Sequence, residues 1–206
     1  DYMYYFQFTI NPYDIKLEEY VPTKSGIIDT FKKLSNKIGP ERVIWRYDPI
    51  ILTDTLTMEY HVKYFEELAK RLEGLTKTCV ISFVDLYKKT ERNLKGTTAR
   101  ELSQSEMLKL ATHLALIAKR YGITIQSCAE KIELASIGIQ HGHCIDNVLI
   151  EDLLGVKLVV SKDKNQRPEC GCVQSIDVGE YNTCKHLCKY CYANFNAHKV
   201  HEKILK

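Results

Sequence analysis

The sequence predicts an α/β protein: a partial (β/α) barrel of the TIM-barrel type, with about four βα units and a cysteine-rich C-terminal extension. Three observations lead to this fold class. Runs rich in β-branched and aromatic residues alternate with longer segments of helical periodicity. The predicted strands begin apolar and end polar. Five of the eight cysteines lie beyond residue 161, where the periodicity stops. We therefore expect the barrel in residues 1–160 and a metal-binding extension in residues 161–206.

Four predicted strands are separated by predicted helices. The strands are expected at 4–11, 42–49, 78–85 and 123–130. Apolar stripes of helical spacing run from Ile27 to Ile38, from His61 to Leu72 and from Met107 to Tyr121, and a short helix is expected at 146–154. Ser103 and Glu106 have the spacing of a capping box at the start of the third helix. Strands that are joined through helices run parallel, so a partial barrel and an open α/β sheet both fit this order of elements.

Length and composition limit the classes of protein that fit. The chain has 206 residues, 45% of them hydrophobic, and a net charge of +3. This charge gives no argument for nucleic acid or an anionic membrane, and no apolar run approaches the roughly 20 residues that a membrane span needs. No signal peptide is visible, so we expect a cytoplasmic protein without a membrane partner. The chain opens on "DYMYYFQFTI" without a methionine, and four βα units make half a barrel, so we expect that upstream residues are missing.

Polar residues at the predicted strand ends are the candidates for catalysis. In barrels and open α/β sheets the carboxyl ends of the strands form the working face. Arg46 and Asp48 end the second strand, and they either bind substrate or form an ion pair with each other. Asp85 and Glu130 end the third and fourth strands and are candidate acid–base or cofactor-anchoring groups.

The stretch "YNTCKHLCKYCYANFN" carries the strongest chemical signal in the chain. Cys184, Cys188 and Cys191 have the spacing C-x3-C-x2-C, which lets three sulfurs converge on one centre from a single loop. Thiolates suit iron–sulfur clusters, zinc and copper(I). Three thiolates leave one metal position open, as in reactive sites. Tyr190 is placed to cover this centre.

Four other cysteines form a second candidate metal site: Cys128, Cys144, Cys170 and Cys172. A cluster or zinc ion held by them would fasten the tail to the barrel. Two other interpretations stay open. Cys128 and Cys144 fit equally well as buried small hydrophobic residues. Cys170 or Cys172 could instead complete a structural zinc site with the first three cysteines.

Cys184-x3-Cys188-x-Tyr190-Cys191 resembles the C-x3-C-x-aromatic-C signature of radical S-adenosylmethionine enzymes. The wider chain, with "RVIWRYDPI", "CVISFVDLYKKT", "CGCVQSIDVGEYNTC" and "CKYCYAN", resembles an uncharacterised prokaryotic domain family that has such a cysteine cluster at its C-terminus. The resemblance implies a four-iron, four-sulfur (4Fe-4S) cluster, bound S-adenosylmethionine and a full or partial barrel. In most radical S-adenosylmethionine enzymes the motif follows the first strand. We expect the tail to fold over that same face, because the last strand of a closed barrel neighbours the first.

Three functions remain open on the sequence. The first is an iron–sulfur redox enzyme of the radical S-adenosylmethionine kind, acting on an unknown substrate. The second is a non-catalytic binding module stabilised by zinc or a cluster, with nucleic acid as a partner through the basic stretch 86–100. The third is an electron-transfer protein with an electron donor as its partner.

Overall fold

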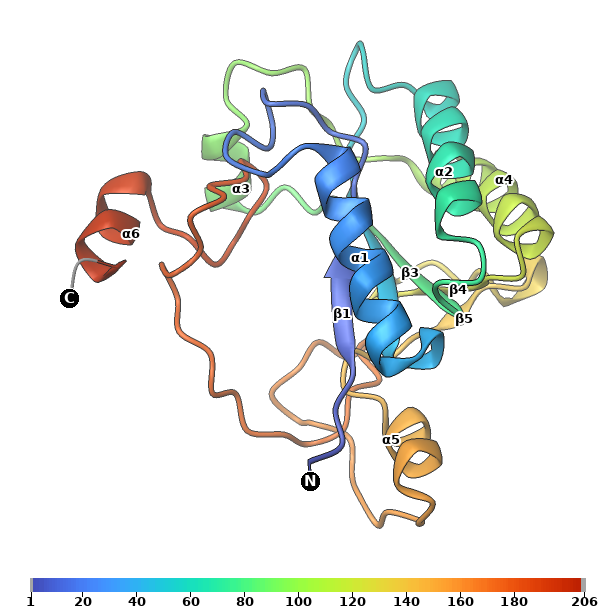
Figure 1. Ribbon diagram of the computed structural model, residues 1–206. Helices are drawn as coiled ribbons and strands as arrows, with labels where there is room; N and C mark the ends of the chain where they lie inside the picture. Colours follow the sequence, from blue (N-terminus) through green and yellow to red (C-terminus); the bar gives the residue numbers. More distant parts are fainter. Residues whose placement is uncertain (1, 205–206) are drawn as a thin grey trace.

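The computed structural model describes residues 2–204 and contains one parallel sheet (Figure 1). Its five strands are β1 (Phe6–Thr9), β2 (Val43–Ile50), β3 (Thr78–Phe83), β4 (Thr124–Ser127) and β5 (Gln140–His141). Neighbouring strands pair in the order β1-β2-β3-β4-β5, and every pairing is parallel. The sheet is not closed. The four predicted strands are confirmed as elements, with ends up to three residues from the predicted ones.

Three helices cover one face of the sheet: α1 (Lys24–Ile38), α2 (Met58–Leu72) and α4 (Gln104–Arg120). Their apolar stripes pack on Trp45 and Tyr47 of β2 and on the neighbouring strands. Phe65 of α2 stacks on Trp45 with ring centroids 4.8 Å apart. Burial of these large side chains is the main stabilising contribution on this face. The predicted helices are therefore confirmed, including the capping box between Ser103 and Glu106.

The remaining elements are short. They are η1 (Pro40–Arg42), α3 (Lys88–Asn93), η2 (Ala135–Ile137), α5 (Asn147–Leu154) and α6 (Ala197–Ile204). The sequence predicted α5 but gave no sign of α3, β5 or α6. A strand of two residues and helices of six and eight residues are too short to show a reliable period. None of the helices in residues 2–204 is long and apolar enough to cross a membrane.

The chain after β5 covers the second face of the sheet. The backbone carbonyl of Cys144 accepts hydrogen bonds from Tyr5 Oη and Gln7 Nε2, each 2.6 Å long, so this segment lies across to β1. Residues 161–174 then form a small hairpin, in which Asp163 N donates to Cys172 O at 2.9 Å and Gln174 N donates to Ser161 O at 2.9 Å. Val173 N also donates to Ile145 O, at 3.2 Å. The hairpin is therefore tied to the chain that leaves β5.

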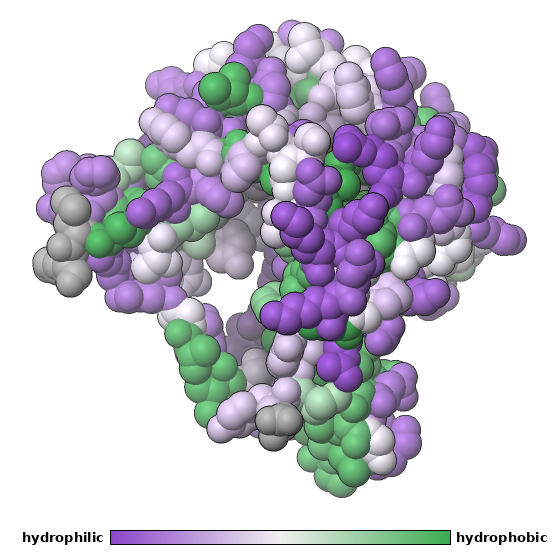
Figure 2. All heavy atoms as spheres, in the orientation of Figure 1, coloured by the Kyte–Doolittle hydropathy of each residue, from purple (hydrophilic) through white to green (hydrophobic). Residues whose placement is uncertain are grey.

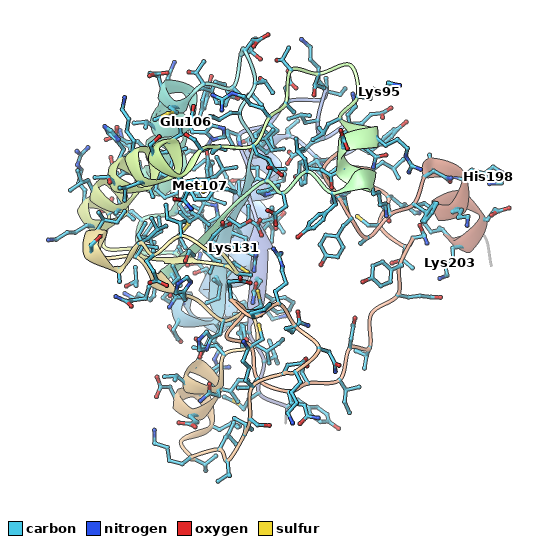
Figure 3. The ribbon with its side chains drawn as sticks, turned by 180° about the vertical axis from the view of Figure 1, so that it is seen from behind. Lys95, Glu106, Met107, Lys131, His198 and Lys203 are labelled. Atoms are coloured by element: carbon cyan, nitrogen blue, oxygen red, sulfur yellow. The ribbon has the colours of Figure 1, made fainter. Side chains whose placement is uncertain are left out.

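Beyond the hairpin the chain continues toward α6 as an extended segment, visible in orange to red in Figure 1. Ile176 and Val178 in this segment are 89% and 94% exposed. Figure 2 shows an opening between the segment and the body of the molecule. From behind, Figure 3 shows α6, labelled at His198 and Lys203, standing at the edge of the molecule. The sequence predicted a domain boundary near residue 160, and this boundary stays a prediction.

Burial of His61 gives an expected pH dependence of stability. His61 Nε2 lies 2.9 Å from Ile51 O, which can only accept, so Nδ1 accepts the Tyr47 hydroxyl at 2.8 Å and the imidazole is neutral. Burial lowers the pKa of His61 from 6.5 to about 4, and the Ile51 carbonyl opposes this. The unfolded chain therefore binds the proton first as the pH falls from 6.5. We expect the free energy of unfolding to decrease by about 3 kcal/mol between these two pKa values.

The comparison of the natural chain with His61→Gln isolates this contribution. Urea denaturation of both proteins from pH 7 to pH 4.5, at constant metal and salt, should show a smaller decrease for His61→Gln. Parallel curves for the two proteins would show that His61 does not carry the effect.

Candidate metal centres and candidate active site

Arg46 and Asp48 lie on the sheet face opposite the helices. Side chains alternate along a strand, so Trp45 and Tyr47 enter the helix-covered core while Arg46 and Asp48 point away from it. Arg46 Nε donates to Asp48 Oδ2 at 2.9 Å, and Nη2 forms a second contact with the same oxygen. Ser82 Oγ donates to Asp48 Oδ1. The two residues thus form an ion pair, which was one of the two predicted interpretations.

Arg46 also connects this ion pair to the second group of cysteines. Its Nη1 donates to Gln7 Oε1 at 2.5 Å and lies 2.9 Å from Cys144 Sγ. Asn11, just past β1, donates from Nδ2 to Asp48 O and accepts the Asp48 amide at its Oδ1. Residues at the carboxyl ends of β1, β2 and β3 therefore share one polar network.

Asp85 and Glu130 lie at the same end of the sheet but outside this network. Asp85 pairs with Arg167 of the hairpin at 2.8 Å and accepts the Tyr87 hydroxyl at 2.9 Å. Glu130 Oε1 accepts the Phe83 amide at 2.8 Å. Burial raises the pKa of Glu130 to about 7, partly opposed by the Phe83 amide. A carboxyl group with such a pKa can hold or release a proton near neutrality.

The loop with Cys184, Cys188 and Cys191 lies beside the loop that follows β1. Lys189 N donates to Leu17 O at 3.0 Å, and Tyr20 N donates to His186 O at 3.3 Å. Cys184 is exposed, while Cys188 and Cys191 are half-buried. Burial raises the pKa of Cys188 to about 11, and the charge of Glu18 adds to this. These backbone contacts place the loop of three cysteines next to the chain that leaves β1.

Tyr190 attaches this loop to the body. Its ring packs edge-to-face on Tyr13, with centroids 5.7 Å apart, in a small apolar cluster that also contains Leu17. Its hydroxyl donates to Glu18 Oε1 and accepts from Asn11 Nδ2 at 3.3 Å. Tyr190 therefore turns toward the body of the molecule, where it anchors the loop that carries the three cysteines.

The second group of cysteines is brought together from three segments. Cys128 Sγ, after β4, and Cys144 Sγ, after β5, are 3.4 Å apart. Cys172 Sγ, in the hairpin, accepts hydrogen bonds from Cys144 N at 3.2 Å and from Ile145 N at 3.3 Å. Cys170 lies two residues before Cys172 in the same hairpin and is also buried. The Cys128 thiol lowers the pKa of Cys144 by a hydrogen bond; burial opposes this and Arg46 adds to it.

All eight cysteines are free thiols, and Cys79 is fully buried in β3. Within residues 2–204, no three cysteine, histidine, aspartate or glutamate side chains converge tightly enough to surround a single ion. The two cysteine groups nevertheless have the donor chemistry for soft metals.

The basic stretch 86–100 includes α3 and contacts the tail. Lys89 Nζ donates to Tyr192 O at 2.5 Å, and Arg92 Nη2 donates to Phe195 O at 3.3 Å. Both cations also lie over the Phe195 ring, at 5.2 and 5.8 Å from its centroid. These two charges therefore hold the end of the tail in the folded chain.

Glu18, Asn194 and Arg167 contribute to the site but were not predicted from the sequence. Glu18 is buried and contacts Tyr190 and Lys24. Asn194 Nδ2 donates to Cys184 O at 2.8 Å, and Arg167 pairs with Asp85. Each lies in a loop without periodicity. The only available signal for Asn194 was its place directly after the cysteine motif.

These features define a class of protein: an α/β protein with a parallel sheet and two groups of free thiols at the carboxyl ends of its strands. Over residues 1–193, a span that includes every cysteine, the chain matches the family described as a domain of unknown function (DUF1848), and it belongs to that family. Neither the curated proteins nor the solved structures that were searched gave a match.

Proposed function

We propose that this chain is an iron–sulfur protein and a redox enzyme of the radical S-adenosylmethionine kind, with Cys184, Cys188 and Cys191 as the ligands of a four-iron cluster. One observation carries the proposal. The three thiols lie on one loop that is attached beside the β1 loop, at the carboxyl ends of the strands. In proteins with parallel sheets this edge is where substrates bind.

The residues around the loop fit this role. When bound, a four-iron cluster with one open position supplies single-electron reduction of S-adenosylmethionine. Tyr190 and Glu18 hold the loop against the body and keep water from one side of Cys188. Tyr192, the residue after Cys191, lies near the charges of Arg46 and Asp48. Those two side chains, with Ser82, form an ordered polar surface that would orient a substrate.

The strand order supports a partial (β/α) barrel as the scaffold. Sequential strands pair without reversal from β1 to β5, as they do in barrels, whereas doubly wound open sheets reverse their order at a switch point. The helices α1, α2 and α4 lie on one face, as barrel helices do.

The test of this function is the iron content of protein purified and reconstituted without oxygen. We expect about four irons and four sulfides per chain, assigned to the loop because Cys184→Ala, Cys188→Ala and Cys191→Ala each abolish the cluster. Cys79→Ala, which removes a thiol from the core, is the matched control and should keep the iron. A colourless protein with zinc on these three cysteines would contradict the proposal.

The exposure of Cys184 favours electron transfer as a second candidate, because a redox partner can approach an exposed cluster closely. Formation of 5′-deoxyadenosine from S-adenosylmethionine, with dithionite as the reductant, separates the two. Production that depends on Cys188 supports the enzyme. A reducible cluster that leaves S-adenosylmethionine intact supports electron transfer.

A further inference from the structure

We propose a second metal centre in this protein: a closed, mononuclear zinc site formed by Cys128, Cys144, Cys170 and Cys172, which fastens the tail to the sheet. This centre is separate from the proposed cluster and does not depend on it. The four residues come from the end of β4, the chain after β5 and the hairpin 161–174.

The distance between the sulfurs of Cys128 and Cys144 fits two ligands of one ion. Cys128 Sγ and Cys144 Sγ are 3.4 Å apart, much longer than the roughly 2.05 Å of a disulfide bond. Two thiolates on one tetrahedral zinc, each about 2.3 Å from the metal, are about 3.8 Å apart. The pair therefore has nearly the separation of two ligands of the same ion.

The surroundings of the sulfurs are those of metal-bound thiolates. Cys172 Sγ accepts two backbone N–H groups, from Cys144 and Ile145. Arg46 Nη1 lies 2.9 Å from Cys144 Sγ and brings a positive charge to a site where zinc with four thiolates has a net charge of −2. Such hydrogen bonds and charges orient thiolate ligands and stabilise their anionic form.

The thiols of the hairpin must close onto the Cys128–Cys144 pair to complete the site, because the described side chains do not yet surround one point. Apart from the Arg167–Asp85 pair and the hydrogen bonds to the chain after β5, the hairpin has few contacts that hold it. Its buried residues are Asp163, Cys170, Cys172 and Val173, so half of them are the proposed ligands. A segment with so few apolar contacts is ordered mainly by what binds it.

Gly171, between the two hairpin ligands, lets the hairpin pack closely against His143. A Cβ atom at this position would lie 2.2 Å from Cδ2 of His143. With alanine between the two cysteines, the loop could keep its approach to the chain after β5 only if the His143 ring moved. Gly171→Ala is therefore a variant that keeps all four thiols and changes only how closely the hairpin packs on the chain after β5.

The experiment measures zinc and iron together in the full chain, purified without oxygen. We expect one zinc per chain in addition to iron. The triple variant Cys184→Ala, Cys188→Ala, Cys191→Ala should lose iron and keep zinc. The double variant Cys144→Ser, Cys172→Ser should lose zinc. If the natural chain binds zinc but no iron, the proposed function is contradicted and the zinc site is not. If it binds iron but no zinc, the zinc site is contradicted and the proposed function is not.

Two measurements keep the proposal testable if a variant does not fold. Cobalt added to the chelated natural chain should give the visible spectrum of a tetrahedral thiolate site. Zinc should also protect Cys128, Cys144, Cys170 and Cys172 from alkylation, read by mass spectrometry. Gly171→Ala should bind zinc at least 10-fold more weakly than the matched control Gly179→Ala, whose Cβ would meet only the side chain of Asp177.

Three results would overturn the proposal. They are a Cys128–Cys144 disulfide in the natural chain that zinc does not prevent, a cobalt spectrum without thiolate bands, and alkylation of the four thiols at the same rate with and without zinc.

Discussion

Replacing Tyr190 by alanine is expected to release the loop that carries Cys184, Cys188 and Cys191. Tyr190 packs on Tyr13, and its hydroxyl donates to the buried carboxylate of Glu18. Tyr190 is partly buried, so removing its side chain costs up to about 3–5 kcal/mol. We expect this loss to exceed the contribution of the two backbone hydrogen bonds that would still join the loop to the body. Limited proteolysis should then cut residues 175–196 faster, while the body stays intact.

Tyr190→Phe is the matched control for this prediction. It keeps the ring in place but takes the donor away from Glu18, which still pairs with Lys24. The expected cost is about 1–3 kcal/mol, without release of the loop. Equal proteolysis of Tyr190→Ala and the natural chain would show that the loop is held by other contacts, such as those between Lys89 and Tyr192.

Replacing Arg46 by methionine is expected to have the second large effect. The side chains of Arg46 and Asp48 are 13% and 21% exposed, so the methionine variant leaves a mostly buried carboxylate without its counter-charge. Breaking such a pair on one side costs about 3–5 kcal/mol. Urea denaturation measures the loss. Gln7 and Cys144 also lose a partner, so the segment after β5 should become more open to proteolysis.

The double variant Arg46→Met, Asp48→Leu separates charge from shape. Replacing both members of a buried ion pair by apolar residues removes the unpaired charge, so we expect it to recover part of the lost stability. The free energy of unfolding of Arg46→Lys should lie between those of the natural chain and Arg46→Met. Lysine keeps the positive charge, but it lacks the planar guanidinium that contacts Asp48 and Gln7 at the same time. Equal stability of Arg46→Met and the natural chain would contradict this prediction, because it would mean that water solvates Asp48 as well as Arg46 does.

The long elements could be predicted because each depends on local pattern. The stripe that includes Phe65 and Leu68 predicts α2, and the spacing of Ser103 and Glu106 predicts the start of α4. Strand-end polarity also predicted the positions of Arg46 and Asp48, although their ion pair was only one of two interpretations. The short elements β5, α3 and α6 carry too few residues to show a period, so they are visible only in the folded chain.

The sequence by itself determined the repeated strand and helix units, the helix caps and the presence of two groups of cysteines, because these depend on residue types at short spacing. Only the tertiary structure decided which residues meet. Cys144 lies 98 residues from Arg46 along the chain and yet contacts it, and Tyr190 reaches Glu18 across 172 residues. Contacts of this kind depend on how the chain after β5 crosses the open face of the sheet. No local pattern encodes that path, because the side chains that fix it come from distant segments and have no common period.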